Sequence, residues 1–317
     1  MRAFAVLSFG EKPALHDLPL PAGDDAYLIR ITYAGANPVD YKIVEGLTGG
    51  EPYPFVVGAD FAGIVERVPR GDHSLRVGDR VFGEAWTHGA YAELTAVAPG
   101  QRLEPLTRIP DGVSDEQAAA LPVAAIAALG SLELLHVAEG QSLVVMGATG
   151  GVGGYAVQMA HARGAHVIGT VLGDIEEAGN LGADEVYDSK AADVVEAIRA
   201  SHPGGVDAVL DLVTGSDAIQ RDCEILKPGG ALVSTIEAAS EAWFAERQIR
   251  AYNLRSSNNP VQSSEGLDVI VRMLADGAIT ARIKSTFELE AAGQMYEMLQ
   301  HGGIRGKAVI RVSQNVV

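Results

Sequence analysis

The stretch SLVVMGATGGVGGYAVQMA, residues 142–160, places a strand, a glycine turn and the start of a helix in succession. The apolar run over 142–146 predicts a buried strand, five glycines follow within 147–154, and the pattern over 153–163 predicts a helix. Small residues let a backbone approach a pyrophosphate, and a helix N-terminus offers free N–H groups and a positive dipole end to phosphates. The turn therefore predicts a dinucleotide site, with a tight structural turn as the alternative, at Thr149, Gly150, Gly151, Val152 and Gly153.

Strands and helices alternate downstream of this turn. The pattern predicts strands over 166–171, 185–187, 206–211 and 231–235, and helices over 175–181, 192–201 and 216–226. Such alternation requires a parallel sheet with right-handed crossovers, so we expect an α/β Rossmann fold with a doubly wound sheet. An apolar strand over 249–254 would end the sheet, and pairing of that edge across a two-fold axis would give a homodimer.

The remainder of the chain does not show this alternation of strands and helices. Short apolar runs over 1–7, 27–34, 62–68, 80–82 and 90–97 predict a β-rich N-terminal region with no long helical period before residue 114. Ser114 and Gln117 form a capping-box pattern that opens a helix over 118–135, with Pro122 as a kink point. Beyond residue 256, a helix over 267–276 and a last strand over 307–312 are too little for a domain, so we expect this tail to rejoin the N-terminal β region.

Composition excludes several classes of function. The chain of 317 residues is 47% hydrophobic, long enough for two domains, and has no apolar run approaching the roughly 18 residues of a membrane span. Its net charge of −17 argues against nucleic-acid binding, and its single cysteine, Cys223, excludes a multi-cysteine zinc site and is expected to be a small packed residue. With no convincing signal peptide, we expect a cytoplasmic protein.

Residues at the carboxyl ends of the predicted strands are the further cofactor candidates. Asp174 follows the second strand and is placed to accept from a ribose 2′-OH, which favours NAD, or to cap the next helix. Ser189 and Lys190 are alternatives that would meet a 2′-phosphate and favour NADP. The remaining candidates follow strand ends in the same way, and they are Thr170, Val213, Thr214 and Ile236.

Three segments together resemble the medium-chain dehydrogenase/reductase superfamily, within it the zinc-independent quinone oxidoreductase and enoyl reductase branch. They are AGANPVDYKIVEG (34–46), VVGADFAGIVERV (56–68) with VGDRVFG (77–83), and GATGGVG (147–153). The resemblance implies a GroES-like β-barrel catalytic domain built from 1–118 and 257–317, a Rossmann domain over 119–256 inserted into it, and an active site in the cleft. It also implies NADPH as the usual cofactor, although NADH stays open.

The resemblance also indicates whether the chain can bind a catalytic zinc ion. Zinc alcohol dehydrogenases of this superfamily carry a cysteine where this chain has Asn37 and a histidine where it has Ala59, and neither residue present is a credible zinc ligand. Without a Lewis acid, hydride addition to a quinone or to an activated C=C bond of an enone suits the site better than alcohol oxidation.

Asn37, Asp40, Tyr41 and Tyr53 are the catalytic candidates. Asn37 and Asp40 are expected to contact nicotinamide ribose or substrate, or else to form a structural turn, because Asn-Pro is also turn chemistry. Tyr41 and Tyr53 are candidate proton donors, with packing as the alternative. By resemblance, Lys307 and Arg305 return near the cleft and would meet phosphate or substrate.

Three functions stay open at this point. The leading one is an NAD(P)H-dependent reductase of a small-molecule quinone or enone. The second is a biosynthetic enoyl reductase that acts on a carrier-bound or CoA-bound double bond. The third is a nucleotide-binding sensor without turnover.

Overall fold

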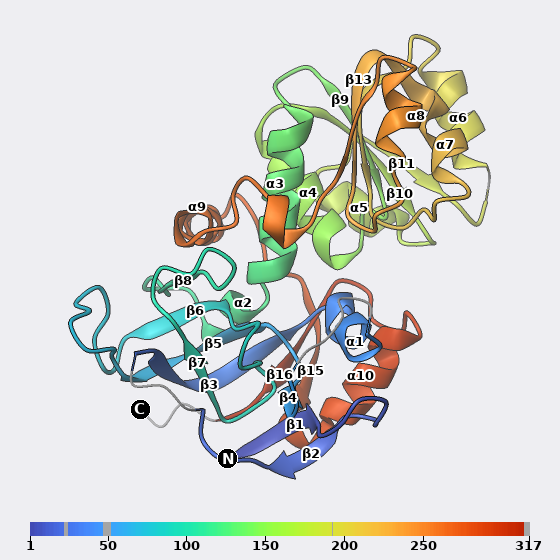
Figure 1. Ribbon diagram of the computed structural model, residues 1–317. Helices are drawn as coiled ribbons and strands as arrows, with labels where there is room; N and C mark the ends of the chain where they lie inside the picture. Colours follow the sequence, from blue (N-terminus) through green and yellow to red (C-terminus); the bar gives the residue numbers. More distant parts are fainter. Residues whose placement is uncertain (22–24, 47–51, 192, 314–317) are drawn as a thin grey trace. The chain divides into compact units, whose positions relative to one another are not determined.

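The computed structural model describes residues 1–21, 25–46, 52–191 and 193–313 (Figure 1). The chain divides into two compact units. Unit 1 comprises Met1–Ile126, Gln262–Gly277 and Ala281–Val317, and unit 2 comprises Ala127–Val261 and Ala278–Thr280. None of the helices in the described ranges has the length and apolar character needed to span a bilayer.

Unit 1 is built on β-sheets. Its larger sheet has the order β15-β16-β3-β5-β6-β8, with β7 paired to β3, and its smaller one the order β2-β1-β4. The larger sheet contains β15 (Ile283–Glu288), β16 (Lys307–Arg311), β3 (Tyr27–Ala36), β5 (Asp60–Arg67), β6 (Arg80–Glu84), β8 (Leu106–Arg108) and β7 (Leu94–Val97). The smaller sheet contains β2 (Ala14–Asp17), β1 (Arg2–Val6) and β4 (Phe55–Val56).

The C-terminal tail completes the larger sheet of unit 1. β16 pairs antiparallel with β3, with Ala308 opposite Ala36. The expectation that the tail rejoins the N-terminal β region is therefore confirmed. Before this strand, α9 (Ser264–Ala275) and α10 (Ala292–Gln300) complete the unit, and Met295 and Leu299 of α10 pack into its apolar core.

A short helix in unit 1 was not predicted. α1 (Pro38–Val44) begins at the N-cap Asn37 and has Pro38 in its first turn, where the missing N–H of proline has no helical partner to lose. Its seven residues make only two turns, which is too short for a helical period to stand out from the sequence. The helix places Asp40 and Tyr41 one turn beyond Asn37.

Unit 2 contains a six-stranded sheet in which every pair is parallel. The order is β11-β10-β9-β12-β13-β14, with β9 (Ser142–Met146), β10 (His166–Val171), β11 (Glu185–Asp188), β12 (Val206–Asp211), β13 (Leu226–Ser234) and β14 (Arg250–Asn253). Figure 1 shows α4 (Gly151–Ala162) and α5 (Ile175–Asn180) on one face, and α6 (Val194–Ser201), α7 (Ile219–Asp222) and α8 (Glu241–Ala245) on the other. The predicted Rossmann sheet is confirmed, with β14 at its edge.

Two helices differ from the sequence-based expectation. The single helix predicted over 118–135 is two, α2 (Asp115–Ala119) and α3 (Pro122–Leu135). The predicted capping box of Ser114 and Gln117 opens α2, and Pro122 starts a new helix instead of kinking the first. The helix predicted over 216–226 shortens to α7 followed by a 3₁₀ turn, Cys223–Ile225, in which Cys223 is buried as expected.

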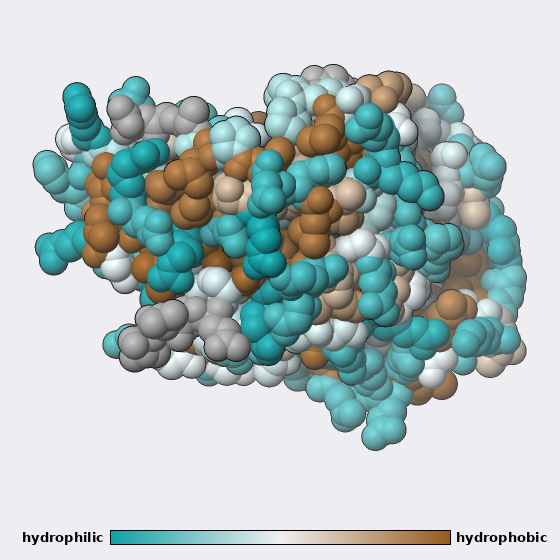
Figure 2. Space-filling view, turned by 90° about the horizontal axis from the view of Figure 1, so that it is seen from below, coloured by the Kyte–Doolittle hydropathy of each residue, from teal (hydrophilic) through white to brown (hydrophobic). Residues whose placement is uncertain are grey.

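The surface mixes polar and apolar side chains. In the space-filling view of Figure 2, hydrophilic residues cover much of the visible face and apolar ones emerge between them. Phe9, 79% exposed, is the most exposed of the large apolar side chains described. Such a mixture is ordinary for a folded protein, because there is too little polar surface to cover it.

Candidate active site and cofactor site

The glycine turn of unit 2 is closed so tightly that side chains are excluded. A Cβ at Gly153 would lie 2.1 Å from the carbonyl oxygen of Gly147. Gly147 itself has φ of +90°, a left-handed conformation that favours glycine, and a Cβ there would lie 2.8 Å from Cγ1 of Val213. The turn therefore requires glycine at 147 and 153, and it lies beside Val213, one of the residues predicted after β12.

The amino end of α4 is arranged to receive an anion. Gly150 is its N-cap and carries no side chain to bond the first-turn N–H groups of Gly151, Val152 and Gly153. A twelve-residue helix leaves these groups unsatisfied within the helix, and its dipole adds positive potential at the same end. The cradle therefore fits the pyrophosphate of a dinucleotide, as the glycine pattern predicted.

Two residues at strand ends hold the turn and the neighbouring loops. Thr170, near the end of β10, accepts from the amide of Ala148 through its carbonyl oxygen at 2.9 Å, and from the amide of Gly147 through its hydroxyl at 3.2 Å. Asp211, the last residue of β12, accepts from the amide of Thr214 at 2.8 Å and from the hydroxyl of Ser234 at 3.0 Å. Asp211 is fully buried, and we had not predicted it.

The other residues predicted at strand ends differ in exposure. Val213 is 64% exposed, whereas the Thr214 hydroxyl is buried and bonds the Asp222 carboxylate at 3.3 Å. Ile236 is half-buried and packs on the core of unit 2. Val213 is therefore the member of this set that presents its side chain beside the turn.

The loop after β10 carries both the acidic and the basic candidate. Asp174 is the N-cap of α5 but makes no side-chain capping bond, so capping does not explain its carboxylate. Ser189 donates its hydroxyl proton to the carbonyl oxygen of Val171 at 2.8 Å. The ammonium of Lys190 lies 3.4 Å from where a Cβ of Gly173 would be, and Lys190 has no ion-pair partner among the residues described.

A buried polar network in unit 1 contains two of the residues predicted from sequence. The ammonium of Lys307 donates to Oδ1 of Asn37 at 2.6 Å and to the carbonyl oxygen of Ala36 at 3.0 Å, and lies 3.4 Å from Oδ2 of Asp60. Asn37 donates from Nδ2 to the same Asp60 oxygen at 2.8 Å. The backbone amide of Val123 donates to the other oxygen of Asp60 at 2.9 Å.

Lys307 is not placed as we expected. Its side chain is 3% exposed, and its ammonium is committed to the network, so it is not available to reach a phosphate. The expectation is corrected: Lys307 neutralises the buried Asp60 carboxylate, which sequence reasoning missed. Arg305 is exposed. In the Gly58–Ala59–Asp60 segment, attention to the missing histidine at position 59 left Asp60 without a predicted role, although its carboxylate belongs to the buried network.

Asp40 holds the turn that carries Asn37. Its Oδ2 accepts from the backbone amide of Asn37 at 2.8 Å and from the hydroxyl of Tyr91 at 2.6 Å. Its Oδ1 is buried and has no partner among the described residues. Burial raises the pKa of Asp40 to about 7. In the structure, Asp40 therefore holds the backbone of Asn37 in place. This agrees with the structural turn that the sequence offered as the alternative to substrate contact.

Tyr41 and Tyr53, the two candidate proton donors, lie outside this network. Tyr41 is half-buried on α1, where its ring packs against the core of unit 1. Tyr53 is 41% exposed. Neither hydroxyl bonds any residue in the described ranges, so both can donate a proton to a ligand.

Another buried acid, Glu84, lies opposite Asp60 in the sheet of unit 1. The two residues pair across β5 and β6. Oε2 of Glu84 accepts from Trp86 Nε1 at 2.5 Å and from Gln262 Nε2 at 2.9 Å, and Oε1 is buried with no partner in the part of the chain that the structure describes. Burial, with the nearby charge of Asp60, raises the pKa of Glu84 to about 8, so the carboxyl is largely protonated at neutral pH.

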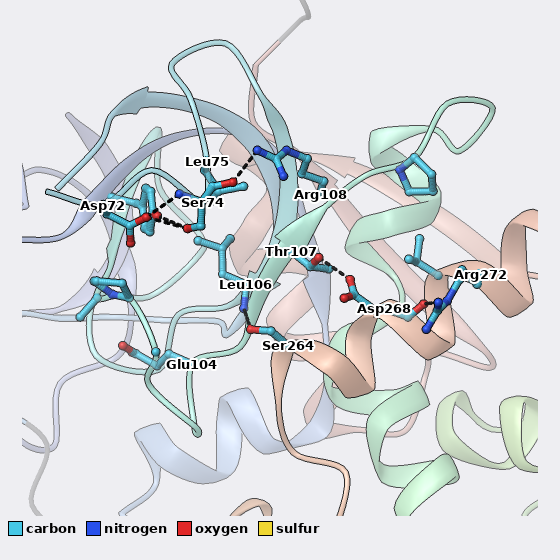
Figure 3. A pocket seen from close by; sticks show the side chains of 16 residues that line it. Asp72, Ser74, Leu75, Glu104, Leu106, Thr107, Arg108, Ser264, Asp268 and Arg272 are labelled. Atoms are coloured by element: carbon cyan, nitrogen blue, oxygen red, sulfur yellow. Dashed lines mark hydrogen bonds between the residues drawn. The ribbon is translucent and has the colours of Figure 1, made fainter.

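Unit 1 also contains an open pocket of about 580 Å³ (Figure 3). The amide of Leu106 donates to Ser264 and the hydroxyl of Thr107 donates to Asp268, so β8 and α9 form one wall. None of the predicted site residues lines it, and its charged lining residues are of both signs, Asp72, Glu104 and Asp268 with Arg108 and Arg272. The amino end of α4, rather than this pocket, offers the free N–H groups that a pyrophosphate requires.

Comparisons with known proteins agree with this geometry. Residues 23–110 match the family described as alcohol dehydrogenase GroES-like domain, and residues 181–310 match the family described as zinc-binding dehydrogenase. The expected GroES-like domain is thereby confirmed. The quinone oxidoreductase of Rattus norvegicus is 31% identical over 330 residues, covering 98% of this chain and 97% of the relative.

Other comparisons extend the picture. A mycocerosic acid synthase-like polyketide synthase of Mycobacterium tuberculosis is 29% identical over 92% of this chain, which spans 14% of that protein. The quinone oxidoreductase of Coxiella burnetii superposes with a TM-score of 0.87 at 30% identity, covering 99% of both chains. A mycobacterial protein solved with NADPH superposes with a TM-score of 0.85 at 25% identity, covering 98% of this chain and 100% of that one.

Proposed function

The chain belongs to the quinone oxidoreductase branch of the medium-chain dehydrogenase/reductase superfamily, and on that basis we propose that it is an NADPH-dependent, zinc-independent reductase of quinones or enones. The observation that carries the proposal is that the side chain of Asn37 is hydrogen-bonded within unit 1. This residue stands where zinc dehydrogenases of the superfamily carry a cysteine, and both atoms of its amide are used in hydrogen bonds to Lys307 and Asp60.

The chemistry of that network supports the proposal of zinc independence. The Lys307 ammonium already supplies a positive charge to the Asp60 carboxylate, so a divalent cation would have to displace it. Ala59 has no ligand atom in its side chain, and Asn37 offers only an amide. These residues favour a reaction that needs no Lewis acid to polarise a carbonyl or an alcohol.

A bound nicotinamide dinucleotide supplies hydride from C4 of its ring. The residues of this chain then have two tasks. The glycine cradle and the amides at the start of α4 hold the pyrophosphate and so orient the cofactor. A hydrogen-bond donor must stabilise the oxyanion that forms when a quinone or enone accepts hydride, and we assign this to the unbonded hydroxyl of Tyr41 or of Tyr53.

We propose NADPH over NADH because of Lys190. Its ammonium lies beside Gly173, in the loop after β10 where the adenosine ribose is expected, and a 2′-phosphate would pair with it. Asp174 in the same loop opposes this preference, because its carboxylate would repel a phosphate and attract a ribose hydroxyl. The mycobacterial protein solved with NADPH supports the same choice.

Enoyl reduction is the second candidate function. The similarity to a segment of a mycobacterial polyketide synthase favours it, because hydride addition to a carrier-bound or CoA-bound enoyl group uses the same metal-free chemistry as enone reduction. A nucleotide-binding sensor is the non-enzymatic alternative. Of the three, quinone or enone reduction agrees best with relatives that match the chain from end to end.

We also propose that the protein is a cytoplasmic homodimer. β14 lies at the edge of the unit 2 sheet, and the outward backbone groups of an edge strand are available to a second copy. Light scattering of the purified chain tests the dimer. A monomer at micromolar concentration would contradict it.

The function is tested by following NADPH and NADH oxidation with 9,10-phenanthrenequinone, a simple enone and a crotonyl thioester. We expect turnover with the quinone or the enone and a preference for NADPH. Turnover with the thioester alone would favour the enoyl reductase. Cofactor binding without turnover of any acceptor would favour the sensor.

A further inference from the structure

Two histidines and a glutamate meet at one edge of unit 2. His166 is the first residue of β10, Glu185 is the first residue of the neighbouring β11, and His202 is the C-cap of α6. Because parallel strands begin at the same edge of a sheet, this cluster lies at the amino edge. The glycine turn lies at the carboxyl edge.

The ligand atoms of the three side chains converge. Nε2 of His166 lies 2.7 Å from Oε1 of Glu185, and Nε2 of His202 lies 3.1 Å from the same oxygen. One ligand atom of each residue lies within 4.8 Å of the other two. In a tetrahedral zinc site with bonds of roughly 2.0–2.1 Å, ligand atoms are about 3.3 Å apart, so little movement would bring all three onto one ion.

The surroundings of the cluster also suit a metal. Oδ2 of Asp184 lies 3.7 Å from the other ring nitrogen of His166, Nδ1, and is held by the backbone amide of Val167 at 2.7 Å. Histidine ligands commonly turn their second ring nitrogen toward a carboxylate. At 3.7 Å the two atoms are beyond hydrogen-bond distance, and metal binding would have to draw the imidazole closer to Asp184 for that bond to form. The hydroxyl of Tyr187 donates to Oε2 of Glu185 at 2.8 Å and orients that ligand.

The cluster is accessible. The side chains of His166, Glu185 and His202 are 42%, 30% and 21% exposed, so an ion and a water molecule can reach them.

We propose that His166, Glu185 and His202 form a binding site for one divalent transition-metal cation, with Zn²⁺ as the best match to a His₂Glu ligand set. Thr170 lies four residue steps along β10 from His166, about 13 Å of extended strand, so the ion does not take part in hydride transfer. It links the edge strand β11 and the end of α6 to β10, and so stabilises unit 2.

Zinc titration of tag-free, metal-stripped protein tests the proposal, with calorimetry as the readout. We expect one zinc per chain. His202→Ala removes a ligand, and it should weaken binding by more than the roughly 10–100-fold typical of losing an outer partner. Asp184→Asn removes only such a partner and should fall within that range. His161→Ala, an exposed histidine on α4, is the matched control and should bind as the wild type does.

Two further readouts keep the test independent of folding defects in a variant. Cobalt added to the wild type should give the intense visible absorption of a tetrahedral site, and zinc should raise the melting temperature of the wild type but not that of His202→Ala. NADPH oxidation should be the same with and without the ion. No binding tighter than millimolar, or equal binding by the wild type and His202→Ala, would overturn the proposal.

Discussion

The ammonium of Lys307 donates a 2.6 Å hydrogen bond to the side-chain oxygen of Asn37, although 270 positions separate the two residues in the chain. The contact joins β16 of the tail to the N-cap of α1, and both residues are buried. In the sequence, Asn37 and Pro38 resemble a local turn. In the structure, the polar contacts of Asn37 include a lysine from β16, the last strand described.

We predict that Lys307→Met destabilises unit 1 by roughly 3–5 kcal/mol, because it leaves the Asp60 carboxylate buried without its cation. The double variant Asp60→Asn with Lys307→Met should recover part of that loss, since no charge is then left unpaired. Urea unfolding of the two single variants and the double variant measures the coupling. Additive losses would show that the pair does not interact.

Gly153→Ala should abolish tight cofactor binding. Its Cβ would lie 2.1 Å from the carbonyl oxygen of Gly147, so the turn must open. Loss of one hydrogen bond to the charged pyrophosphate costs about 1.5–3 kcal/mol, which is roughly 10-fold to 100-fold in affinity. Gly204→Ala, at a position with nothing within 4 Å, is the matched control and should bind NADPH normally in a fluorescence titration. Equal affinities of the two variants would contradict a phosphate cradle at this turn.

Lys190→Ala should weaken NADPH binding by about 10-fold or more, the effect of losing a charged hydrogen bond, and should leave NADH binding unchanged. NADH thus serves as the internal control. Asp174→Asn should strengthen NADPH binding, because it removes a negative charge near the 2′-phosphate. If Lys190→Ala weakens the binding of NADPH and NADH equally, Lys190 does not bind the 2′-phosphate.

Replacement of the donor tyrosine should slow hydride transfer without affecting cofactor binding. We expect Tyr41→Phe or Tyr53→Phe to lower kcat by about 100-fold or more, as loss of a general acid does, with an unchanged Kd for NADPH. The variant that has no effect then serves as the control for the other. Full activity of the double variant would mean that the proton comes from elsewhere.

The buried Glu84 should make stability depend on pH. Its folded pKa of about 8 lies above the ordinary value of 4.5, so the folded state holds a proton that the unfolded state releases. Stability is therefore greatest below the ordinary pKa and falls as the pH rises through the folded one. Glu84→Gln, which imitates the protonated acid, should flatten the decline between about pH 5 and 8 in urea unfolding. An unchanged slope would count against a proton on this group.

The sequence was most informative where one local pattern decides the structure. The strands 142–146, 166–171 and 206–211 were predicted with the bounds that β9, β10 and β12 have, because strands buried on both faces are continuous apolar runs. The glycine turn was predicted for a similar reason, since its conformation requires glycine whatever else surrounds it.

Prediction was poorer where the role of a residue depends on segments that are distant in the sequence. Asp60, Tyr91 and Glu84 acquire their roles only when the sheets of unit 1 form, and no short spacing in the chain announces them. Lys307 was expected to meet phosphate or substrate because the family resemblance places the end of the chain near the cleft. Its burial depends on the pairing of β16 with β3.

Quinone reduction by metal-free protein tests the central claim most directly. The protein is stripped with a chelator, its zinc content is measured, and NADPH oxidation is followed with 9,10-phenanthrenequinone as acceptor. We predict undiminished turnover with far less than one zinc per chain. Absence of turnover with both the quinone and an enone, or activity that is lost on stripping and returns with zinc, would contradict the claim.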